Sequence, residues 1–352
     1  QKVIALKDKN GKLLPQFIVI SNIKSKDPAQ VIAGNEKVVS ARLADAAFFY
    51  ETDLKTPLSK RDEALSTLTF QAKLGSVLDK AKRNATLAET LASHCGFDAV
   101  AAKTAGLLGK SDLVTEMVME FPELQGLMGE YYAKAEGLSD EIAAALNEQY
   151  QPRFSGDQLP AHDIGTVLSL ADKLDTLVGI FGIGLKPTGS KDPFALRRAA
   201  IGLIRIIIEK ELALDLAVLI DQAASQYGKL LSNEQVQTDV LHFCFERLKQ
   251  HLVDQGTRVE TFEAVRAKSP TDFADFERRI RAVEAFEQLP EATALASANK
   301  RVANILSKQS APNQPIDSAL FHEKAESPSL KPCHKLKKPS PHCWRIKTIK
   351  PI

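Results

Sequence analysis

Apolar residues recur at every third or fourth position along most of this chain, a spacing that places them on one face of an α-helix. The clearest stretch covers residues 164–181, with apolar positions at Val167, Leu170, Leu174, Leu177 and Phe181. Further helices are predicted over residues 38–56, 65–95, 99–108, 112–121, 138–150, 192–212, 236–252, 272–286 and 289–306. The sequence therefore predicts a mainly α fold without an internal repeat.

The helix predicted from residue 38 has one apolar face, made by Leu43, Ala47, Tyr50 and Leu54. It ends before Pro57, because a proline ring cannot continue a helix. Gly96 in the same way ends the helical stretch over residues 65–95.

One short region reads as β structure instead. Residues 3–6 and 13–20 are largely apolar, and Asn10-Gly11 between them supplies the positive φ angles that a tight turn needs. We expect a β-hairpin here and no other convincing strand. Because two strands need a larger sheet to pack on, and because the chain starts with Gln1 rather than Met, we expect a preceding N-terminal part. No apolar run of about 18 residues predicts a membrane-spanning helix.

Positive charge is concentrated at the C-terminal end. Residues 327–352 hold six Lys, one Arg, five Pro and no acidic residue, whereas residues 1–326 hold 39 basic and 44 acidic residues. Such a segment buries too little apolar surface to offset its ordering entropy, so we expect a disordered tail and low order after about Phe321. The four cysteines are too few and too far apart for a disulfide framework, which favours a reducing, cytoplasmic location.

A glycine-containing loop over residues 182–191 leads into a helix that we expect to begin at Asp192-Pro193. Free amide groups at a helix start favour an anion, although the spacing of a phosphate-binding loop is absent. Arg197 falls on the apolar face of this helix, so it needs a partner, more often a carboxylate on a neighbouring helix than a phosphate. The candidate anion-binding cations here are Lys186, Lys191, Arg197, Arg198 and Arg205.

Asp172 and Asp175 lie one helical turn apart, opposite the apolar stripe, and could hold a metal ion or act as acid and base. A solvated face, or pairing with Lys173 and with arginines elsewhere, is favoured. Asp112, with Ser111 as the expected N-cap, could join them in a metal phosphohydrolase site. Such sites usually need more than one histidine and only His94 is near in sequence, so we expect no metal site and no catalytic residue.

The tail carries Cys333-His334 and His342-Cys343, whose side chains suit zinc but whose spacing matches no strong zinc pattern. Trp344 could stack on a nucleic-acid base, but no further aromatic residues surround it. We interpret the segment as a lysine-rich tail.

Several long motifs occur in an order that resembles the β-subunit family of bacterial tetrameric glycyl-tRNA synthetases. They are Gly34-Asn35, residues 41–54, residues 112–133 from Asp-Leu-Val-Thr-Glu to Tyr-Tyr-Ala, residues 171–177 (Ala-Asp-Lys-Leu-Asp-Thr-Leu) and residues 187–198 (Pro-Thr-Gly-Ser-Lys-Asp-Pro-Phe-Ala-Leu-Arg-Arg). The resemblance extends over about residues 1–326, and the tail after Glu326 departs from it, as a shift of reading frame would produce.

The resemblance implies an α2β2 ligase that uses ATP to attach glycine to tRNA(Gly). The α subunit would bind ATP and carry the adenylate-forming site, and the β subunit, present twice, would bind tRNA. This chain would then be an internal fragment of the β subunit, without a bound cofactor or a membrane partner. The alternatives are a metal-dependent phosphohydrolase that uses Asp112, Asp172 and Asp175, and a structural module that only holds the α subunit.

The resemblance also implies domain boundaries: the end of an N-terminal α/β region over 1–35, a helical domain similar to His-Asp phosphohydrolases over 36–215, a connecting body over 216–274, the start of an anticodon-binding domain over 275–326, and the tail over 327–352. The His-Asp pair would correspond to Ser111-Asp112. Because the histidine is missing, we expect a scaffold or an RNA-docking surface rather than hydrolysis. Lys300 and Arg301 in the fourth region are further candidates for tRNA contacts.

Overall fold

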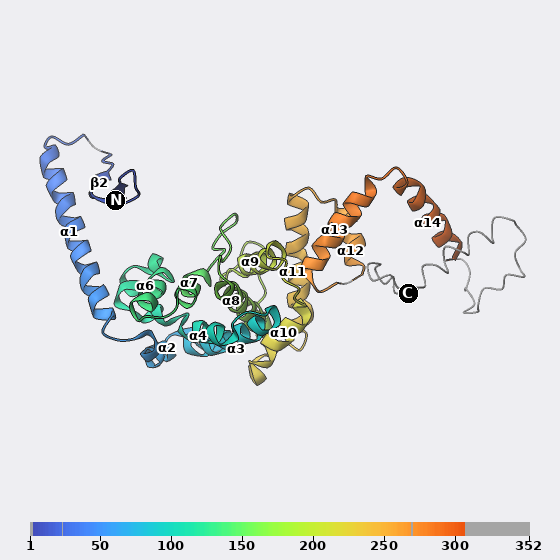
Figure 1. The fold of residues 1–352 in the computed structure, drawn as a ribbon, viewed down its shortest axis with the longest axis horizontal. Coiled ribbons are helices and arrows are strands. Elements are labelled where there is room, and N and C mark those ends of the chain that lie inside the picture. The colour runs from blue at the N-terminus through green and yellow to red at the C-terminus, as the bar shows by residue number, and fades with distance from the viewer. Residues whose placement is uncertain (1–2, 23, 269, 307–352) are drawn as a thin grey trace, which may run out of the picture. The chain divides into compact units, whose positions relative to one another are not determined.

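The computed structural model describes residues 3–22, 24–268 and 270–306, and fourteen α-helices lie within them (Figure 1). The prediction of a mainly α fold is therefore confirmed. The predicted tail over 327–352, with its cysteines, histidines and Trp344, and the predicted loss of order after Phe321 lie outside the described residues. The chain divides into two units, residues 1–286 and 287–352, and each is described by itself.

The predicted β-hairpin is confirmed. Strands β1 (Val3–Lys7) and β2 (Leu13–Val19) pair antiparallel with Val3 opposite Val19, and Gly11 adopts the expected positive φ of 80° in the turn. Helix α1 (Pro28–Asp53) follows and begins earlier than predicted. The Asp27 carboxylate caps it by accepting from the amides of Ala29 and Gln30, and proline at the first helical position favours this start.

The predicted apolar face of α1 is confirmed only at Tyr50. Leu43 and Leu54 are exposed, whereas Ala46, Phe49 and Tyr50 pack partly against the core. The reason is that α1 meets the rest of the unit mainly through its C-terminal end, where it contacts α5 (Glu116–Glu120). Sequence periodicity gives an apolar face but does not show which part of a long helix is covered.

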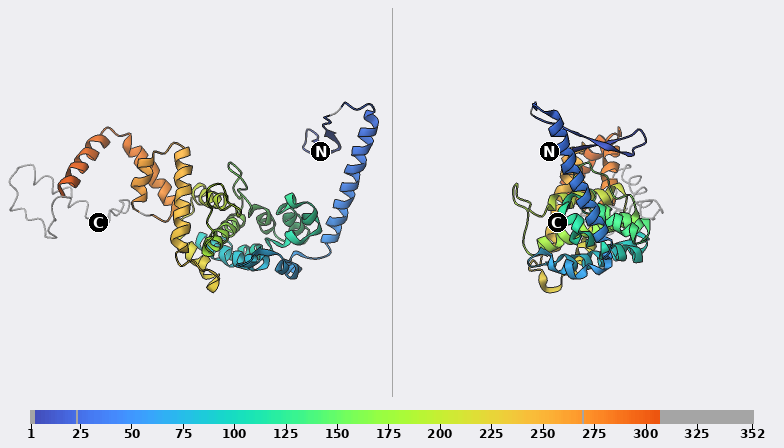
Figure 2. Two further views of the ribbon diagram at one scale, coloured as in Figure 1. Left: turned by 180° about the vertical axis from the view of Figure 1, so that it is seen from behind. Right: turned by 90° about the vertical axis from the view of Figure 1, so that its left-hand side faces the viewer.

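A helical body follows α1, and Figures 1 and 2 show its elements in sequence order by colour. Its further helices and 3₁₀ turns are η1 (Leu58–Lys60), α2 (Asp62–Thr67), α3 (Val77–Cys95), α4 (Ala99–Leu108), η2 (Ser111–Val114), η3 (Pro122–Leu124), α6 (Leu127–Ala135), α7 (Asp140–Glu148), α8 (Asp163–Gly182), α9 (Leu196–Glu209), α10 (Leu216–Ser225), η4 (Gly228–Leu230), α11 (Val236–Asp254), α12 (Val259–Arg266) and α13 (Phe273–Glu287). Three of these, α6, α10 and α12, were not predicted, and the predicted helix over 112–121 is broken at Thr115 into η2 and α5.

A second small hairpin interrupts the stretch that was predicted as helical over 65–95. Strands β3 (Thr69–Gln71) and β4 (Gly75–Ser76) pair antiparallel between α2 and α3. The expectation of a single β element is therefore wrong. The turn covers residues 72–74, and Gly75 after it has a φ of 92°. Ser76 caps the start of α3 through a reciprocal capping box with Asp79. Gly96 ends α3 in the left-handed conformation, as predicted.

Helix α8 is the centre of the body. It is buried along almost its whole length and contacts α3, α7, α9, α10 and α11. Helices α3 and α4 pack closely at Gly106, where an added Cβ atom would lie 2.4 Å from the Cα atom of Ala85. The interior that positions the candidate site is thus a set of helices around α8.

Helix α9 begins later than predicted, at Leu196 rather than at Asp192-Pro193. Asp192 still stabilises its start, because its carboxylate accepts from the amides of Leu196 (2.8 Å) and Arg197 (3.0 Å). In the second unit, α14 (Ala292–Leu306) carries Lys300 and Arg301, both exposed. Within the described ranges, none of the helices combines the length and the apolar character that crossing a membrane requires.

Candidate functional site

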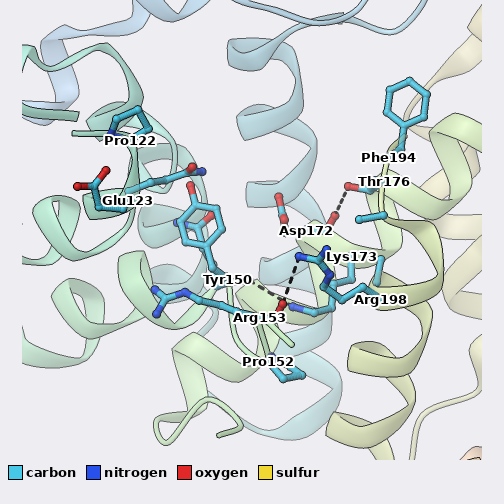
Figure 3. A pocket seen from close by; sticks show the side chains of 14 residues that line it. Pro122, Glu123, Tyr150, Pro152, Arg153, Asp172, Lys173, Thr176, Phe194 and Arg198 are labelled. Atoms are coloured by element: carbon cyan, nitrogen blue, oxygen red, sulfur yellow. Dashed lines mark hydrogen bonds between the residues drawn. The ribbon is translucent and has the colours of Figure 1, made fainter. Parts of the chain in front are cut away.

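A cleft of about 400 Å³ opens between α8, the segment that follows α7, and the start of α9 (Figure 3). Tyr150 and Arg153 line it from the segment after α7, Asp172 and Lys173 from α8, and Arg198 from α9. The remaining lining residues are Pro122, Glu123, Gln125, Gln149, Pro152, Thr176, Phe194, Ala195 and Ala199. The cleft therefore brings together candidate residues that lie far apart in the sequence.

Below this cleft, α3 and α8 are joined by buried ion pairs. Asp175 is fully buried, and its carboxylate accepts from Arg83 Nε at 2.7 Å and from Lys80 Nζ at 3.1 Å. The predicted pairing of these aspartates with an arginine elsewhere is confirmed for Asp175. The predicted solvated face is wrong, because α3 packs against the side of α8 that the apolar stripe leaves open.

Asp172 lies beside two lysines. Its Oδ1 atom is 3.0 Å from Lys110 Nζ and 3.3 Å from Lys80 Nζ, and it also accepts from Asn84 Nδ2 at 2.8 Å. Burial alone would raise the pKa of Asp172, but the Lys110 and Lys80 ammonium groups hold that pKa below its usual range. The carboxylate is therefore ionised and already compensated.

Lys173 does not pair with Asp172, contrary to one of the predicted arrangements. Its ammonium group donates to Ser169 Oγ (2.6 Å) and to the carbonyl oxygens of Gln151 (2.7 Å) and Gln149 (3.4 Å). Burial, with the positive charges of Lys110 and Lys80 nearby, lowers the pKa of Lys173 to about 7. Lys173 is thus a buried amine that changes its charge near neutral pH.

Asp112, unlike Asp172 and Asp175, is held by backbone amides rather than by cations. Its Oδ2 atom accepts from the amides of Gly126 (2.5 Å) and Gly129 (3.2 Å) at the start of α6, and burial raises the pKa of its carboxyl group. Ser111 is not an N-cap, contrary to prediction, because the 3₁₀ turn begins with it and Lys110 precedes it. Asp112 therefore stabilises the start of α6.

The arrangement does not resemble a metal centre. No group of three His, Cys, Asp or Glu residues within the described ranges lies close enough to hold a metal ion. Asp172 and Asp175 face cations, Asp112 faces amides, and His94 is exposed, with its Nδ1 atom 2.8 Å from the Thr90 carbonyl oxygen. The alternative of a metal phosphohydrolase thus has no convergent donor set on which to rest.

The predicted cations at the start of α9 have mostly neutral partners. Arg197 donates to the carbonyl oxygen of Gly189 at 2.7 Å, so the expected ion pair with an acid on a neighbouring helix is wrong. Because α9 starts at Leu196, Arg197 lies in its first turn beside the loop, where a backbone carbonyl is within reach. Arg198 is exposed and makes a long contact, 3.3 Å, with the Arg153 carbonyl oxygen.

The other predicted cations differ in their surroundings. Arg205 pairs with Glu209 at 2.6 Å and donates to the Asp157 carbonyl oxygen, and Lys186 pairs with Asp239 at 2.7 Å. Hydrogen bonding to Lys186 lowers the pKa of Asp239. Lys191 is exposed in the loop before α9, and Lys300 and Arg301 belong to the second unit.

Sequence reasoning missed Arg153 and Arg247. Arg153 donates to Asn147 Oδ1 at 2.6 Å, and Arg247 lies with Arg197 and Arg198 around a neighbouring cleft of about 350 Å³. Neither residue stands in a motif, because their proximity to α9 arises only when α7, α9 and α11 pack around α8. Within the described ranges, the guanidinium groups of Arg153, Arg197 and Arg198 contact neutral acceptors and no carboxylate.

Comparison with known proteins identifies related sequences. A family model described as glycyl-tRNA synthetase beta subunit matches residues 1–267. The chain is 52% identical, over 96% of its length, to the glycine–tRNA ligase beta subunit of Chromohalobacter salexigens, and covers 50% of that protein. The corresponding values are 53%, 93% and 48% for the beta subunit of Psychromonas ingrahamii, and 54%, 88% and 45% for that of Ectopseudomonas mendocina.

The chain thus spans about half the length of the curated relatives that it matches. Because 96% of the chain is more than residues 1–326, the first of these alignments includes part of the segment that was expected to depart from the family.

Proposed function

Because the chain belongs to the glycyl-tRNA synthetase β-subunit family, we propose that it forms a tRNA-binding part of a glycine–tRNA ligase. In this proposal an α subunit binds ATP and forms the glycyl adenylate, and two copies of each subunit assemble in the cytoplasm. This chain supplies a surface for tRNA(Gly) and no catalytic residue.

The observation that carries the proposal is the group of arginines without carboxylate partners around the start of α9. Arg153, Arg197 and Arg198 contact neutral acceptors, whereas Arg83 and Arg205 pair with acids. Arginine and lysine side chains on one surface supply the contacts to phosphate that dominate nucleic-acid affinity. Cations that are not neutralised by the protein are available for such contacts.

The buried ion pairs support a scaffold role for the body around α8. Lys80, Arg83 and Lys110 hold Asp172 and Asp175, so these carboxylates hold the helices together and are compensated by cations. The exposed arginines would thereby be presented by a fixed set of helices. Bond-breaking chemistry by these aspartates has no support in this geometry.

We also propose the domain boundaries that the family resemblance implies. They are a helical His-Asp-like domain over 36–215, a connecting body over 216–274, and the start of an anticodon-binding domain over 275–326. Exposure of Lys300 and Arg301 on α14 supports RNA contacts in the last region. Lys186, which pairs with Asp239, is a weaker candidate than Lys191.

A second candidate is a structural module that binds the α subunit and no RNA. The large apolar side chains exposed along α1 favour it, because Val38, Leu43 and Phe48 are each more than 60% exposed. Leu43 shares its face of the helix with Ile32, which is 59% exposed, and exposed apolar surface of this kind is typical of protein contacts. Titration of the chain with tRNA(Gly) in the absence of the α subunit distinguishes the two candidates.

The test of the main proposal is the affinity of the full 352-residue chain for tRNA(Gly), measured by filter binding over a range of salt concentrations. We expect the Arg197→Gln/Arg198→Gln double variant to bind more weakly and with a smaller dependence on salt. The matched control is Lys103→Gln, because Lys103 is an exposed cation already paired with Glu89. Equal affinity and salt dependence in the double variant and the unmodified chain would exclude this surface.

A further inference from the structure

The buried charges beneath the cleft do not balance. Lys80, Arg83, Lys110 and Lys173 are each at most 7% exposed. Among the described residues, the first three form ion pairs with Asp172 and Asp175 alone, and Lys173 donates to neutral acceptors. Unpaired charge is costly in a protein interior, so a buried surplus of cations calls for a further anion. The lowered pKa of Lys173 is consistent with this surplus, because its like-charged neighbours disfavour its protonated form.

Further acids near these cations are already engaged or exposed. Asp112 directs Oδ2 to the amides of Gly126 and Gly129, and its pKa is raised by burial, so it is less readily ionised than an ordinary aspartate. Asp157, whose charge acts on Lys173, accepts from the amides of Arg153 and Gln158, and Glu123 in the lining is exposed. These acids form no ion pair with the four buried cations.

One of these four cations, Lys173, lines a cavity that a ligand can reach. Lys173 and Asp172 line the cleft on α8, and Arg153 and Arg198 line it from two other segments (Figure 3). Both arginines have only neutral partners among the described residues. The volume of about 400 Å³ is within the range of small-molecule sites, about 300 to 1,000 Å³.

We infer that this cleft binds a phosphate group carried by a small organic moiety, with the arginines at its rim contacting the phosphate oxygens. The planar guanidinium group donates two parallel hydrogen bonds to phosphate, which makes two arginines from separate segments at one cleft suitable phosphate ligands. Tyr150 and Phe194 supply aromatic surface in the same lining for the organic part. A free nucleoside phosphate and the last nucleotide of a single-stranded RNA share this chemistry.

The inference goes beyond the tRNA proposal and is tested separately from it. Adenosine monophosphate is titrated into the full chain and into an Arg153→Gln/Arg198→Gln double variant by isothermal calorimetry. Each lost contact between an arginine and a phosphate removes a charge-assisted hydrogen bond, so we expect saturable binding that weakens about tenfold or more in the variant. Lys103→Gln is expected to bind as the unmodified chain does, because Lys103 is not part of the lining and is already paired with Glu89.

The inference is overturned by the absence of saturable binding of adenosine monophosphate at millimolar concentration, or by equal affinity in the double variant while its thermal unfolding is unchanged. Competition by glutamate as strong as that by inorganic phosphate would also overturn it, because the site would then select any anion. If a short single-stranded RNA displaces adenosine monophosphate, the cleft binds the phosphate of an RNA end. If adenosine monophosphate stays bound in the presence of that RNA, the cleft binds a free small molecule. If the chain binds tRNA but does not bind adenosine monophosphate, the tRNA proposal stands and only the inference about the cleft is wrong.

Discussion

Arg83 on α3 and Asp175 on α8 form a buried ion pair, with 2.7 Å between Arg83 Nε and Asp175 Oδ1. The Arg83 guanidinium carbon also lies 4.1 Å from the centre of the Tyr227 ring, and the Tyr227 hydroxyl donates to the Asp175 carbonyl oxygen at 2.9 Å. Two helices that are distant in sequence are therefore joined through charge, aromatic and hydrogen-bond contacts at one place. Removal of the Asp175 charge would leave Arg83 buried without a carboxylate partner, whereas Asp175 also pairs with Lys80.

We expect Asp175→Asn to lower the free energy of unfolding by about 3 to 5 kcal/mol, the usual cost of leaving one buried charge unpaired. Urea unfolding followed by circular dichroism measures this change. The matched control is Glu89→Gln, which removes the exposed Lys103–Glu89 pair (3.0 Å) and is expected to cost about 1 kcal/mol or less. Similar losses in the two variants would show that the buried pair has no special role.

Gly106 tests the close packing of α3 against α4. A Cβ atom at this position would lie 2.4 Å from Ala85 Cα and 2.8 Å from its backbone nitrogen, and backbone atoms cannot move as a flexible side chain can. We expect Gly106→Ala to lower the free energy of unfolding by about 3 kcal/mol in the same urea experiment.

The control for this variant is Gly34→Ala on the exposed face of α1, where an added Cβ atom meets nothing within 4 Å. Because alanine favours helix more than glycine does, this variant is expected to lose no stability and to gain up to about 1 kcal/mol. If Gly106→Ala behaved like Gly34→Ala, the two helices would be able to separate without cost.

The sequence predicted most of the helices and the first hairpin, because strong apolar periodicity and turn residues are local signals. It failed where tertiary contacts decide the outcome. For Asp175 a solvated face was one of two expectations, because the apolar stripe from Val167 to Phe181 marks only one side of α8, whereas the helix is covered on nearly all sides. The β3–β4 hairpin was missed because its strands have two and three residues.

The candidate site was only partly accessible to sequence reasoning. Arg197 and Arg198 were found because they follow a loop at a helix start, whereas Arg153 belongs to no motif and reaches the cleft only through packing. The partner of Arg197, a loop carbonyl, depends on where α9 begins, which the sequence placed at Asp192-Pro193. Arg205 and Glu209 are four residues apart within the helix, so their pairing is a local feature.

The charge of Lys173 predicts a dependence of stability on pH. Burial lowers the pKa of its folded-state ammonium group to about 7, whereas in the unfolded chain it keeps its ordinary value of 10.5. Between these pH values the unfolded state binds more protons, so the free energy of unfolding should rise as pH increases. Below about pH 7 both states are protonated, and the folded state has the full cost of the buried charge.

Urea unfolding at several pH values between about 7 and 10 measures this effect, with Lys173→Met as the comparison. The variant leaves the carbonyl groups of Gln149 and Gln151 without their donor, which itself lowers the free energy of unfolding. The quantity to compare is therefore the change of that free energy with pH. Thiol groups such as Cys244, whose pKa is raised to about 12 by burial, titrate equally in both proteins. The expected result is a smaller rise with pH in Lys173→Met, and identical slopes would contradict the assignment.

Arg198 and Arg205 lie on the same helix, but only Arg205 is neutralised by a carboxylate. Arg198 is exposed and has only a long contact to a carbonyl oxygen, whereas the Arg205 side chain is 14% exposed and pairs with Glu209. A cation that touches an RNA phosphate releases counterions, so we expect Arg198→Gln to reduce the slope of log affinity against log salt by about 0.7 to 0.9. Arg205→Gln should change that slope little, although both variants remove one positive charge. Filter binding of tRNA(Gly) to the full chain at several salt concentrations measures both slopes. Equal reductions would mean that the total charge of α9, rather than contact by Arg198, determines the affinity.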